Sequence, residues 1–325
     1  MSIFSLASHL LSFSSRELLL FFRYKIFGHK MIRLEASSMC QLQCPACPTG
    51  QRKTKELKVG WGTLTFDHFK SIVDNNPKIK YIELSNWGEI FLNPELKKII
   101  EYAFLRDIHL SANNGVNLNS LTQEMAQLLV KFRFRSMTIS IDGASQDTYV
   151  NYRRNGNFKK VIENIESINR YKTQYGSKYP NLRWQFVVFG HNQHEIPLAR
   201  DMAKRLGMRF FTKQNWSAQY SPTQGTQKHT PSQGNQTEAP YILSYCNQLW
   251  ISPQVNWDGT LLGCCVNRTV SFGNVFETGL ENCLNSESYR YLKRMVAGKA
   301  DARANMPCLG CRYYRGRKLG TPRAN

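Results

Sequence analysis

The chain has 325 residues, which is enough for one large domain and a small one, and its 42% hydrophobic and 12% aromatic residues exclude a disordered polypeptide. Lys and Arg number 43 against 23 Asp and Glu, so the formal net charge of +20 favours acidic partners such as nucleic acid, phosphorylated metabolites or an anionic membrane face. Because the basic residues are scattered, with one late cluster at 312–318, a general surface bias explains the charge equally well.

The first 30 residues contain no recognisable targeting segment. Residues 1–15 are apolar and rich in serine without a basic start, and the apolar run 18–22 is far shorter than the roughly 20 residues of a membrane-spanning helix. We therefore expect a cytoplasmic protein, in which thiols stay free or bind metal. Segment 1–30 is predicted to be helical, and it either packs on the main domain or makes a peripheral contact with a membrane.

Residues 31–215 alternate between two kinds of pattern. Strand-like runs occupy 31–36, 79–84, 108–111, 136–141, 182–189 and 208–213. Helix-like runs with apolar residues at helical spacing occupy 94–104, 124–132, 157–171 and 195–207. Six strands separated by helices predict βα units and a parallel sheet, so the fold class is α/β. A doubly wound sheet and a full or partial barrel both fit this pattern.

Unusual residues follow each predicted strand. They are the three cysteines of 40–47, then 85–89, 113–115, 142–143, 190–192 and 214–216. In barrels and open α/β sheets the carboxyl ends of the strands carry the chemistry, so these loops predict an active site at one barrel mouth. Gly, Asn and Asp are also ordinary turn formers, which explains the Asn-Gly and Asp-Gly pairs but not the cysteines.

The remaining cysteines lie beyond residue 241. Residues 216–241 are rich in Pro, Gly, Ser, Thr and Gln and predict a flexible linker, and 242–325 form a small module with six of the nine cysteines. Cys308-x2-Cys311 has the spacing of a zinc knuckle, which Cys246 with Cys264 or Cys265 would complete. The first group has three cysteines and no nearby histidine, a set that suits a four-iron cluster with one iron left open.

The segment Cys40-x3-Cys44-x2-Cys47, directly after the first predicted strand, resembles the signature of the radical S-adenosylmethionine (SAM) superfamily. This resemblance implies a partial (β/α)6 TIM-like barrel over residues 31–215. It also implies that the three cysteines bind a [4Fe–4S] cluster whose open iron takes the amino and carboxylate groups of SAM. The resemblance to this family extends over about residues 31–315.

Two later segments resemble the SAM-binding segments of the family. Gly88-Glu89 is similar to the Gly-Gly-Glu-Pro segment that holds the SAM amino group, although Trp87 and Ile90 replace its first Gly and its Pro. Ser140 and Arg153 are similar to the Ser and Arg that contact the SAM carboxylate, and Arg154 is an alternative to Arg153.

The C-terminal module resembles a SPASM domain, and within it 257–260 resembles the turn of a β-hairpin. A full SPASM domain has further cysteines after the position of Cys311, so the module is similar to the shortened "twitch" form. The resemblance implies one auxiliary [4Fe–4S] cluster with four thiolate ligands, which are Cys246, Cys264, Cys308 and Cys311. Cys283 falls in a predicted helix and is interpreted as a packed residue.

The resemblance implies that the protein cleaves SAM reductively to a 5′-deoxyadenosyl radical, which abstracts hydrogen from the substrate. An external one-electron reductant of the flavodoxin or ferredoxin type is expected. The substrate is predicted to be small and polar or sugar-like, with a peptide as the alternative, and the outcome is oxidation or epimerisation. For epimerisation, Cys265 would return a hydrogen atom, since on a hairpin it should point away from the face of Cys264. The alternative is that Cys265 packs into the core of the small module, in which case the auxiliary cluster would accept an electron and the outcome would be oxidation.

Two other function classes remain open at this stage. The charge of +20 would suit an RNA-modifying member of the family, but the sequence shows no separate RNA-binding module, so nucleic acid is not the expected partner. A non-catalytic zinc protein that binds nucleic acid would explain the second cysteine group. The position of the first group at a barrel mouth argues against that class.

Overall fold

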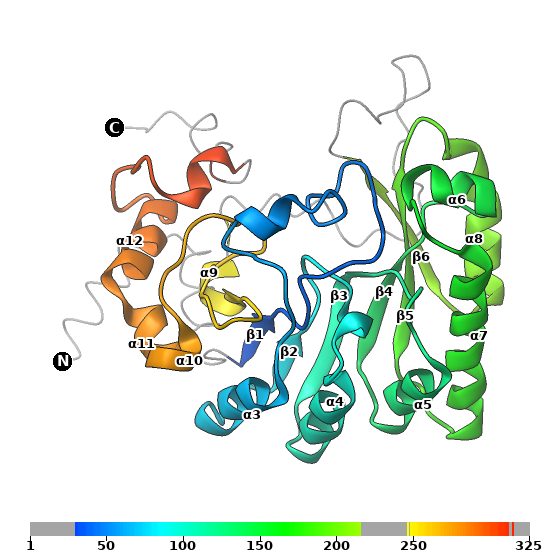
Figure 1. Cartoon of the computed structure of the whole chain (residues 1–325), viewed down its shortest axis with the longest axis horizontal. Coiled ribbons are helices and arrows are strands. Elements are labelled where there is room, and N and C mark those ends of the chain that lie inside the picture. The colour runs from blue at the N-terminus through cyan, green and yellow to red at the C-terminus, as the bar shows by residue number, and fades with distance from the viewer. Residues whose placement is uncertain (1–29, 216–245, 247, 312–313, 315–325) are drawn as a thin grey trace, which may run out of the picture.

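A computed structural model describes residues 30–215, 246, 248–311 and 314. Its centre is one parallel sheet of seven strands in the order β6-β5-β4-β3-β2-β1-β7 (Figure 1). The strands are β1 (Met31–Leu34), β2 (Tyr81–Glu83), β3 (His109–Val116), β4 (Ser136–Ser140), β5 (Asn181–Val188), β6 (Arg209–Gln214) and β7 (Gln254–Val255). The six predicted strands are therefore present in the predicted order.

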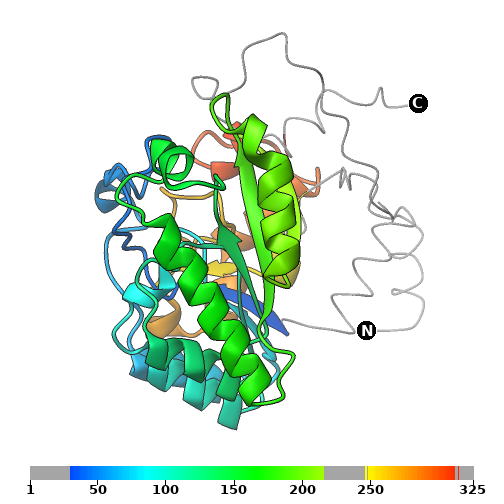
Figure 2. The same cartoon turned by 90° about the vertical axis from the view of Figure 1, so that its right-hand side faces the viewer.

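Helices cover one face of this sheet. They are α3 (Phe66–Asn75), α4 (Leu96–Leu105), α5 (Gln123–Lys131), α6 (Gln146–Tyr152), α7 (Phe158–Gln174) and α8 (Ile196–Arg205) (Figures 1 and 2). Thr65, Thr122, Ser145 and Asn157 each cap a helix by accepting a hydrogen bond from a main-chain amide of its first turn. Helices α3 and α6 were not predicted from the sequence.

The structure corrects the sequence prediction at β3. Residues Asn113, Asn114 and Gly115 were expected in a loop after the third strand, but they lie inside β3, whose pairing with β4 shifts register between Ala112 and Val116. The strand continues because the main-chain amides of Asn113 and Asn114 donate to the side-chain carboxylate of Glu83 on β2. Such an irregularity redirects side chains near the end of a strand.

The C-terminal part of the chain extends the barrel sheet. β7 pairs in parallel with β1 through Arg33–Gln254 and Leu34–Val255, so the sheet has one strand more than the six predicted. The predicted turn is present, because the amide of Asn256 donates to the carbonyl of Thr260 at 2.9 Å. The Trp257 indole also donates to the Val59 carbonyl at 2.9 Å, which fixes the turn on the loop that precedes α3.

The remaining helices belong to the C-terminal part. They are α9 (Gln248–Ile251), α10 (Val275–Thr278), α11 (Leu280–Asn285) and α12 (Glu287–Val296), and short 3-10 helices occur at η1 (Lys53–Glu56), η2 (Ile90–Leu92), η3 (Gln193–Glu195) and η5 (Pro307–Gly310). Cys283 is buried on α11, which confirms its interpretation as a packed residue. In the part of the chain that the structure describes, no helix is long and apolar enough to cross a membrane.

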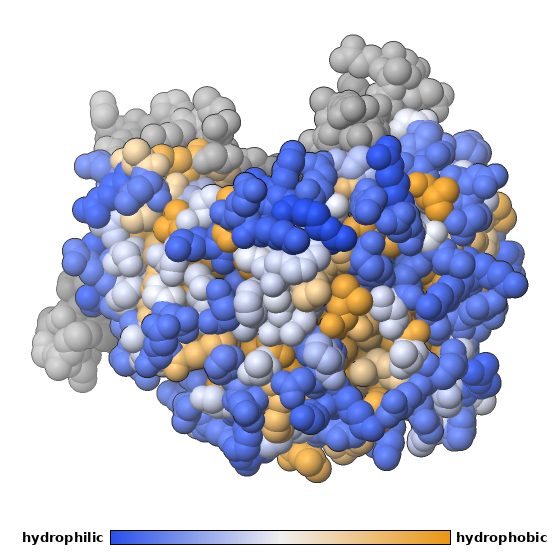
Figure 3. Space-filling view, viewed as in Figure 1, coloured by the Kyte–Doolittle hydropathy of each residue, from blue (hydrophilic) through white to orange (hydrophobic). Residues whose placement is uncertain are grey.

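Several predictions concern residues outside the described ranges. They include residues 1–29 of the predicted helical segment 1–30 with its membrane contact, the whole of the linker at 216–241, and most of the basic cluster at 312–318. Among the described residues, the face seen in Figure 3 is largely hydrophilic. Its most hydrophilic region lies over the loop after β1, which contains the basic residues Arg52, Lys53, Lys55 and Lys58.

Candidate active site

The three cysteines of the first motif lie in the long loop between β1 and α3. Two main-chain hydrogen bonds, from Cys47 N to Cys44 O at 3.1 Å and from Gln51 N to Cys47 O at 2.9 Å, fold this loop tightly. Cys44 is buried in a small apolar cluster whose other members are Leu42, Tyr152, Val187 and Phe189. Cys40 and Cys47 pack against the same cluster, so the fold brings the three predicted ligands together.

The surroundings of these thiols disfavour free thiolates. Burial raises the pKa of Cys40 to about 12, and the neighbouring Glu89 carboxylate adds to the shift. Burial also raises the pKa of Cys44 to about 11, although the charge of Arg153 acts in the opposite direction. Thiolates at these positions therefore need a cationic group between them, as an iron–sulfur cluster would provide.

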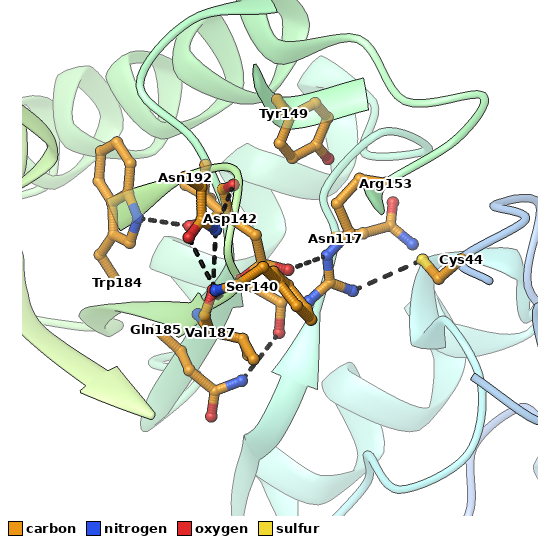
Figure 4. A network of polar contacts seen from close by, with 12 residues as sticks. Cys44, Asn117, Ser140, Asp142, Tyr149, Arg153, Trp184, Gln185, Val187 and Asn192 are labelled. Carbon is orange, nitrogen blue, oxygen red and sulfur yellow. Dashed lines mark hydrogen bonds and ion pairs between the residues drawn. The ribbon is translucent and has the colours of Figure 1, made fainter. Parts of the chain in front are cut away.

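Arg153 connects the motif to the end of β4. Its Nε pairs with Asp142 Oδ2 at 2.6 Å, and its Nη1 donates to the Cys44 sulfur at 3.9 Å (Figure 4). Asp142 is fully buried and also accepts from the Val187 amide at 2.8 Å. Burial by itself lowers the pKa of Arg153, but the charges of Asp142 and Cys44 hold it well above its ordinary value, so the guanidinium stays cationic.

Ser140 occupies the last position of β4 and is buried. Its hydroxyl accepts from Gln185 Nε2 at 3.5 Å, and a side chain at Gly115 on β3 would place its Cβ 2.7 Å from the Ser140 Oγ. Gly115 therefore leaves room beside this hydroxyl. The proposed contact of Ser140 and Arg153 with the SAM carboxylate stays a prediction.

Gly88 is tightly enclosed in the loop after β2. A Cβ at Gly88 would collide with the Ser37 carbonyl and lie 2.7 Å from the Met39 nitrogen, so only glycine fits here. The next amide, that of Glu89, donates to the Met39 carbonyl at 2.7 Å. The loop after β2 is thus pressed against the chain that leads into Cys40.

Glu89 has a buried side chain that faces other protein groups. Its carboxylate accepts from the Asn117 amide at 2.6 Å and the Phe91 amide at 3.5 Å, and burial raises its pKa to about 7. Because the side chain is used in this way, a contact of Glu89 with the SAM amine would use its main chain.

Glu35 was missed by sequence reasoning. It follows β1, is fully buried, and its Oε1 accepts from the Trp87 amide at 2.9 Å and the Gly88 amide at 3.2 Å. Burial raises its pKa to about 7. A glutamate in the otherwise apolar run Leu34–Glu35–Ala36 was the only signal in the sequence, and it does not reveal the partner loop.

The second cysteine group lines one cavity in the C-terminal part. Its walls include all five candidate thiols, which are Cys246, Cys264, Cys265, Cys308 and Cys311. Burial raises the pKa of Cys264 and of Cys308 to about 12. The donor set of this cavity is therefore rich in sulfur, which fits an iron–sulfur cluster.

The position of Cys265 corrects a prediction. It was expected to point away from the face of Cys264, but both residues line the same cavity. The reason is local: the Cys264–Val266 segment forms a turn after the hairpin, where strand alternation does not apply. The Cys265 carbonyl accepts from Asn86 Nδ2 at 3.2 Å, so this turn touches the loop after β2.

Within the described residues, no three His, Cys, Asp or Glu side chains are arranged to hold a single metal ion. A zinc site would need its thiolates about 2.3 Å from one centre. A four-iron cluster binds each thiolate to a different iron, so its ligands stand further apart.

The sequence matches two family models. The model of the radical SAM superfamily matches residues 34–191, and that of an iron–sulfur cluster-binding domain, SPASM, matches residues 246–312. Together the two models cover most of the chain.

Two curated proteins are similar in sequence. An "AdoMet-dependent heme synthase" from Methanosarcina barkeri is 28% identical over 180 residues, which are 55% of this chain and 48% of that protein. The match thus spans about half the length of the heme synthase. A "Tungsten-containing aldehyde ferredoxin oxidoreductase cofactor-modifying protein" from Pyrococcus furiosus is 22% identical over 305 residues, with 81% of this chain and 83% of that protein covered.

Solved structures share the fold at low identity. Streptococcus suis SuiB bound to S-adenosylmethionine aligns with a TM-score of 0.61 at 13% identity, over 93% of this chain and 78% of that chain. The anSMEcpe structure with bound AdoMet and a peptide aligns with a TM-score of 0.54 at 14% identity, over 89% and 87% of the two chains. These likenesses support the partial barrel with an appended SPASM domain.

Proposed function

We propose that this protein removes a hydrogen atom from a small polar substrate and gives an oxidised product. The chain belongs to the radical SAM superfamily and carries a SPASM domain. As a radical SAM enzyme it uses a [4Fe–4S] cluster, SAM and an auxiliary iron–sulfur site. When bound, the reduced cluster supplies the single electron that breaks a carbon–sulfur bond of SAM and yields a 5′-deoxyadenosyl radical.

The residues of the first site have distinct proposed roles. Cys40, Cys44 and Cys47 hold the cluster. Arg153 stays cationic through Asp142 and supplies a charged donor for the SAM carboxylate, next to Cys44. Ser140 adds a hydroxyl, and the main chain of Gly88–Glu89 binds the SAM amine.

The observation that carries the oxidation proposal is the hydrogen bond from Asn86 to the Cys265 carbonyl. It joins the turn that carries the second cysteine group to the loop after β2, which itself contacts the segment before Cys40. The cavity of Cys246, Cys264, Cys308 and Cys311 therefore lies near the barrel mouth. A cluster bound there would supply an acceptor for the electron that a substrate radical loses on oxidation, with its proton released to solvent. The two curated relatives are named for making or modifying cofactors, which favours a small substrate over a peptide.

Epimerisation is a second candidate because Cys265 lies in the cavity but is not one of the four proposed ligands. In that reaction the Cys265 thiol would return a hydrogen atom to the substrate radical. One electron from the external reductant and one proton would then convert the resulting thiyl radical back to the thiol. A Cys265→Ala variant run in heavy water separates the candidates. Oxidation predicts that product forms in the variant and that the parent product carries no solvent deuterium. Deuterated product in the parent, lost in the variant, would instead establish epimerisation.

The loop after the first motif suits a reductant of the flavodoxin or ferredoxin type. Lys53, Lys55 and Lys58 are exposed there, and the Arg52 side chain donates to the Cys40 carbonyl. A basic surface so close to the first cysteine group would attract an acidic electron donor. The RNA-modifying alternative gains no specific support from the described residues.

The test of the proposed function is an anaerobic assay of reconstituted protein with SAM, dithionite and a panel of small polar metabolites. Cleavage should release 5′-deoxyadenosine at a low basal rate, and the true substrate should raise that rate. The Cys44→Ala variant is the negative control. If the parent forms no more 5′-deoxyadenosine than this variant, the proposed function is wrong.

A further inference from the structure

The face of the sheet opposite the helices is polar throughout its middle. Register pairs place side chains of neighbouring strands on one face, and one row crosses four strands. Its members are Arg33, Glu83, Ser111 and Ser136. The alternate residues, such as Ile82, Leu110 and Met137, belong to the apolar core. A barrel interior that serves only for packing is filled by branched apolar residues, so this face is built for a polar occupant.

Hydrogen bonds connect most of this polar face internally. Ser111 donates to Glu83 Oε2 at 2.6 Å, and Ser136 donates to Asn113 Oδ1 at 2.9 Å. Arg33 donates to the Gln254 side chain on β7 at 3.1 Å. Polar groups whose hydrogen bonds are made within the protein have few donors or acceptors left for a ligand.

Two neighbours are the exception. Thr138 on β4 and Arg183 on β5 are register partners, so their side chains lie side by side. Thr138 is fully buried, and neither its Oγ1 nor the buried Nε of Arg183 has a hydrogen-bond partner within the described residues. Buried polar groups are rarely left without a partner, so each such group needs an explanation. A ligand that accepts hydrogen bonds would satisfy both.

The charges around Arg183 favour an anionic acceptor. Its Nη2 donates to the side-chain oxygen of Asn113. None of the ion pairs found among the described residues includes Arg183, although the charge of Glu83 lies near enough to act on it. The neighbouring carboxylate of Glu83 accepts hydrogen bonds from the hydroxyls of Ser85 and Ser111 and from the main-chain amide of Asn113. The Nε and the terminal nitrogen beside it form the edge of a guanidinium that binds a carboxylate or phosphate through two hydrogen bonds. In Arg183 the Nε on this edge has no partner within the described residues.

We propose that Arg183 and Thr138, with Asn113 holding the guanidinium, form a subsite for an anionic oxygen group, carboxylate or phosphate, of the substrate. The proposal rests on the proposed function and narrows its substrate class from polar to anionic. Thr138 precedes Ser140 by two residues on β4, which is about 7 Å along a strand. The subsite therefore lies below the position proposed for SAM, on the side toward the middle of the sheet.

The test measures binding of matched probe pairs to the SAM-loaded, reconstituted enzyme by anaerobic calorimetry at constant ionic strength. One pair is acetate and acetamide, and the other is glucose 6-phosphate and glucose. We expect the anionic member of at least one pair to bind about tenfold more tightly than its neutral partner. The pair that shows this preference distinguishes a carboxylate from a phosphate.

Variants of the two residues decide whether this preference arises at the subsite. Arg183→Gln should remove it, Arg183→Lys should retain part of it, and Thr138→Val should weaken it several-fold. Arg209→Gln is the matched control, because this arginine pairs with Arg183 but is exposed. If Arg183→Gln does not fold, Thr138→Val and Arg183→Lys carry the test.

Three results would overturn the subsite: no anionic probe bound by the parent, unchanged binding in the Arg183 and Thr138 variants, or an equal loss in the Arg209 control. Release of 5′-deoxyadenosine by the parent without any probe is measured on the same preparation. Its absence would count against the proposed function and not against anion binding, so the two failures are separable.

Discussion

Arg153 and Cys44 lie 109 positions apart in the sequence, yet the guanidinium donates to the Cys44 sulfur at 3.9 Å (Figure 4). The other edge of the same guanidinium is fixed by Asp142. The cysteine motif after β1 and Asp142, which follows β4, are thus joined by one charged side chain.

Replacement of Arg153 by Gln should weaken SAM binding by about 10- to 100-fold, because it removes a charge-assisted hydrogen bond at the cofactor carboxylate. Calorimetry with the oxidised, cluster-loaded protein measures this. Arg154→Gln is the control, since Arg154 is exposed. The opposite pattern, with Arg154 sensitive and Arg153 silent, would assign the role to Arg154.

Iron content tests the two cysteine groups. Reconstituted protein should contain about eight irons per chain, and the Cys308→Ala, Cys311→Ala double variant about four. Cys283→Ala should keep the parent content, because Cys283 packs on α11 and does not line the cavity. Stoichiometric zinc without iron in the parent would contradict both assignments.

Gly88→Ala should destabilise the protein by about 1–3 kcal/mol, because the new Cβ collides with main-chain atoms of Ser37 and Met39 that cannot move freely. Chemical denaturation under anaerobic conditions measures the free energy of unfolding. Gly176→Ala has nothing within 4 Å of its Cβ and a φ of +57°, so it should show only the cost of left-handed backbone, about 1 kcal/mol. Equal losses of unfolding free energy in the two variants would show that the protein relaxes to remove the collision at position 88.

The buried carboxyl group of Glu35 should make stability depend on pH. Its pKa in the folded state is about 7, above the ordinary value of 4.5, so the folded state binds the proton more tightly than the unfolded state. The free energy of unfolding should therefore fall as pH rises from about 4.5 to about 7, by up to about 3 kcal/mol from this group.

Glu35→Gln should reduce that slope and leave the share of Glu89, whose pKa burial also raises to about 7. The reason is that Gln can still accept from the Trp87 and Gly88 main-chain amides but carries no charge. Denaturation midpoints at pH 5.5, 6.5 and 7.5 measure the difference from the parent. The exposed Glu56→Gln is the control and should leave the slope unchanged. A slope in Glu35→Gln that equals the slope of the parent would mean that Glu35 does not contribute to it.

The sequence determined much of the barrel by itself. Strands and long helices can be predicted from the short-range periodicity of apolar residues, so the order of β1 to β6 was predictable. The motif of Cys40, Cys44 and Cys47 was equally clear, because its spacing is local. The loop position of these residues followed from the order of the strands.

Tertiary structure alone decided the rest. Pairing of β7 with β1 joins residues 33 and 254, and no local pattern encodes that contact. Cys265 shares a cavity with Cys264 because their segment turns, and Glu35 finds its partners in the loop after β2. The unsatisfied pair of Thr138 and Arg183 is visible only when β4 and β5 are placed side by side. Hydrogen-bond satisfaction depends on neighbours that folding brings from distant parts of the chain, so a sequence read along its length cannot reveal which polar groups are left for a ligand.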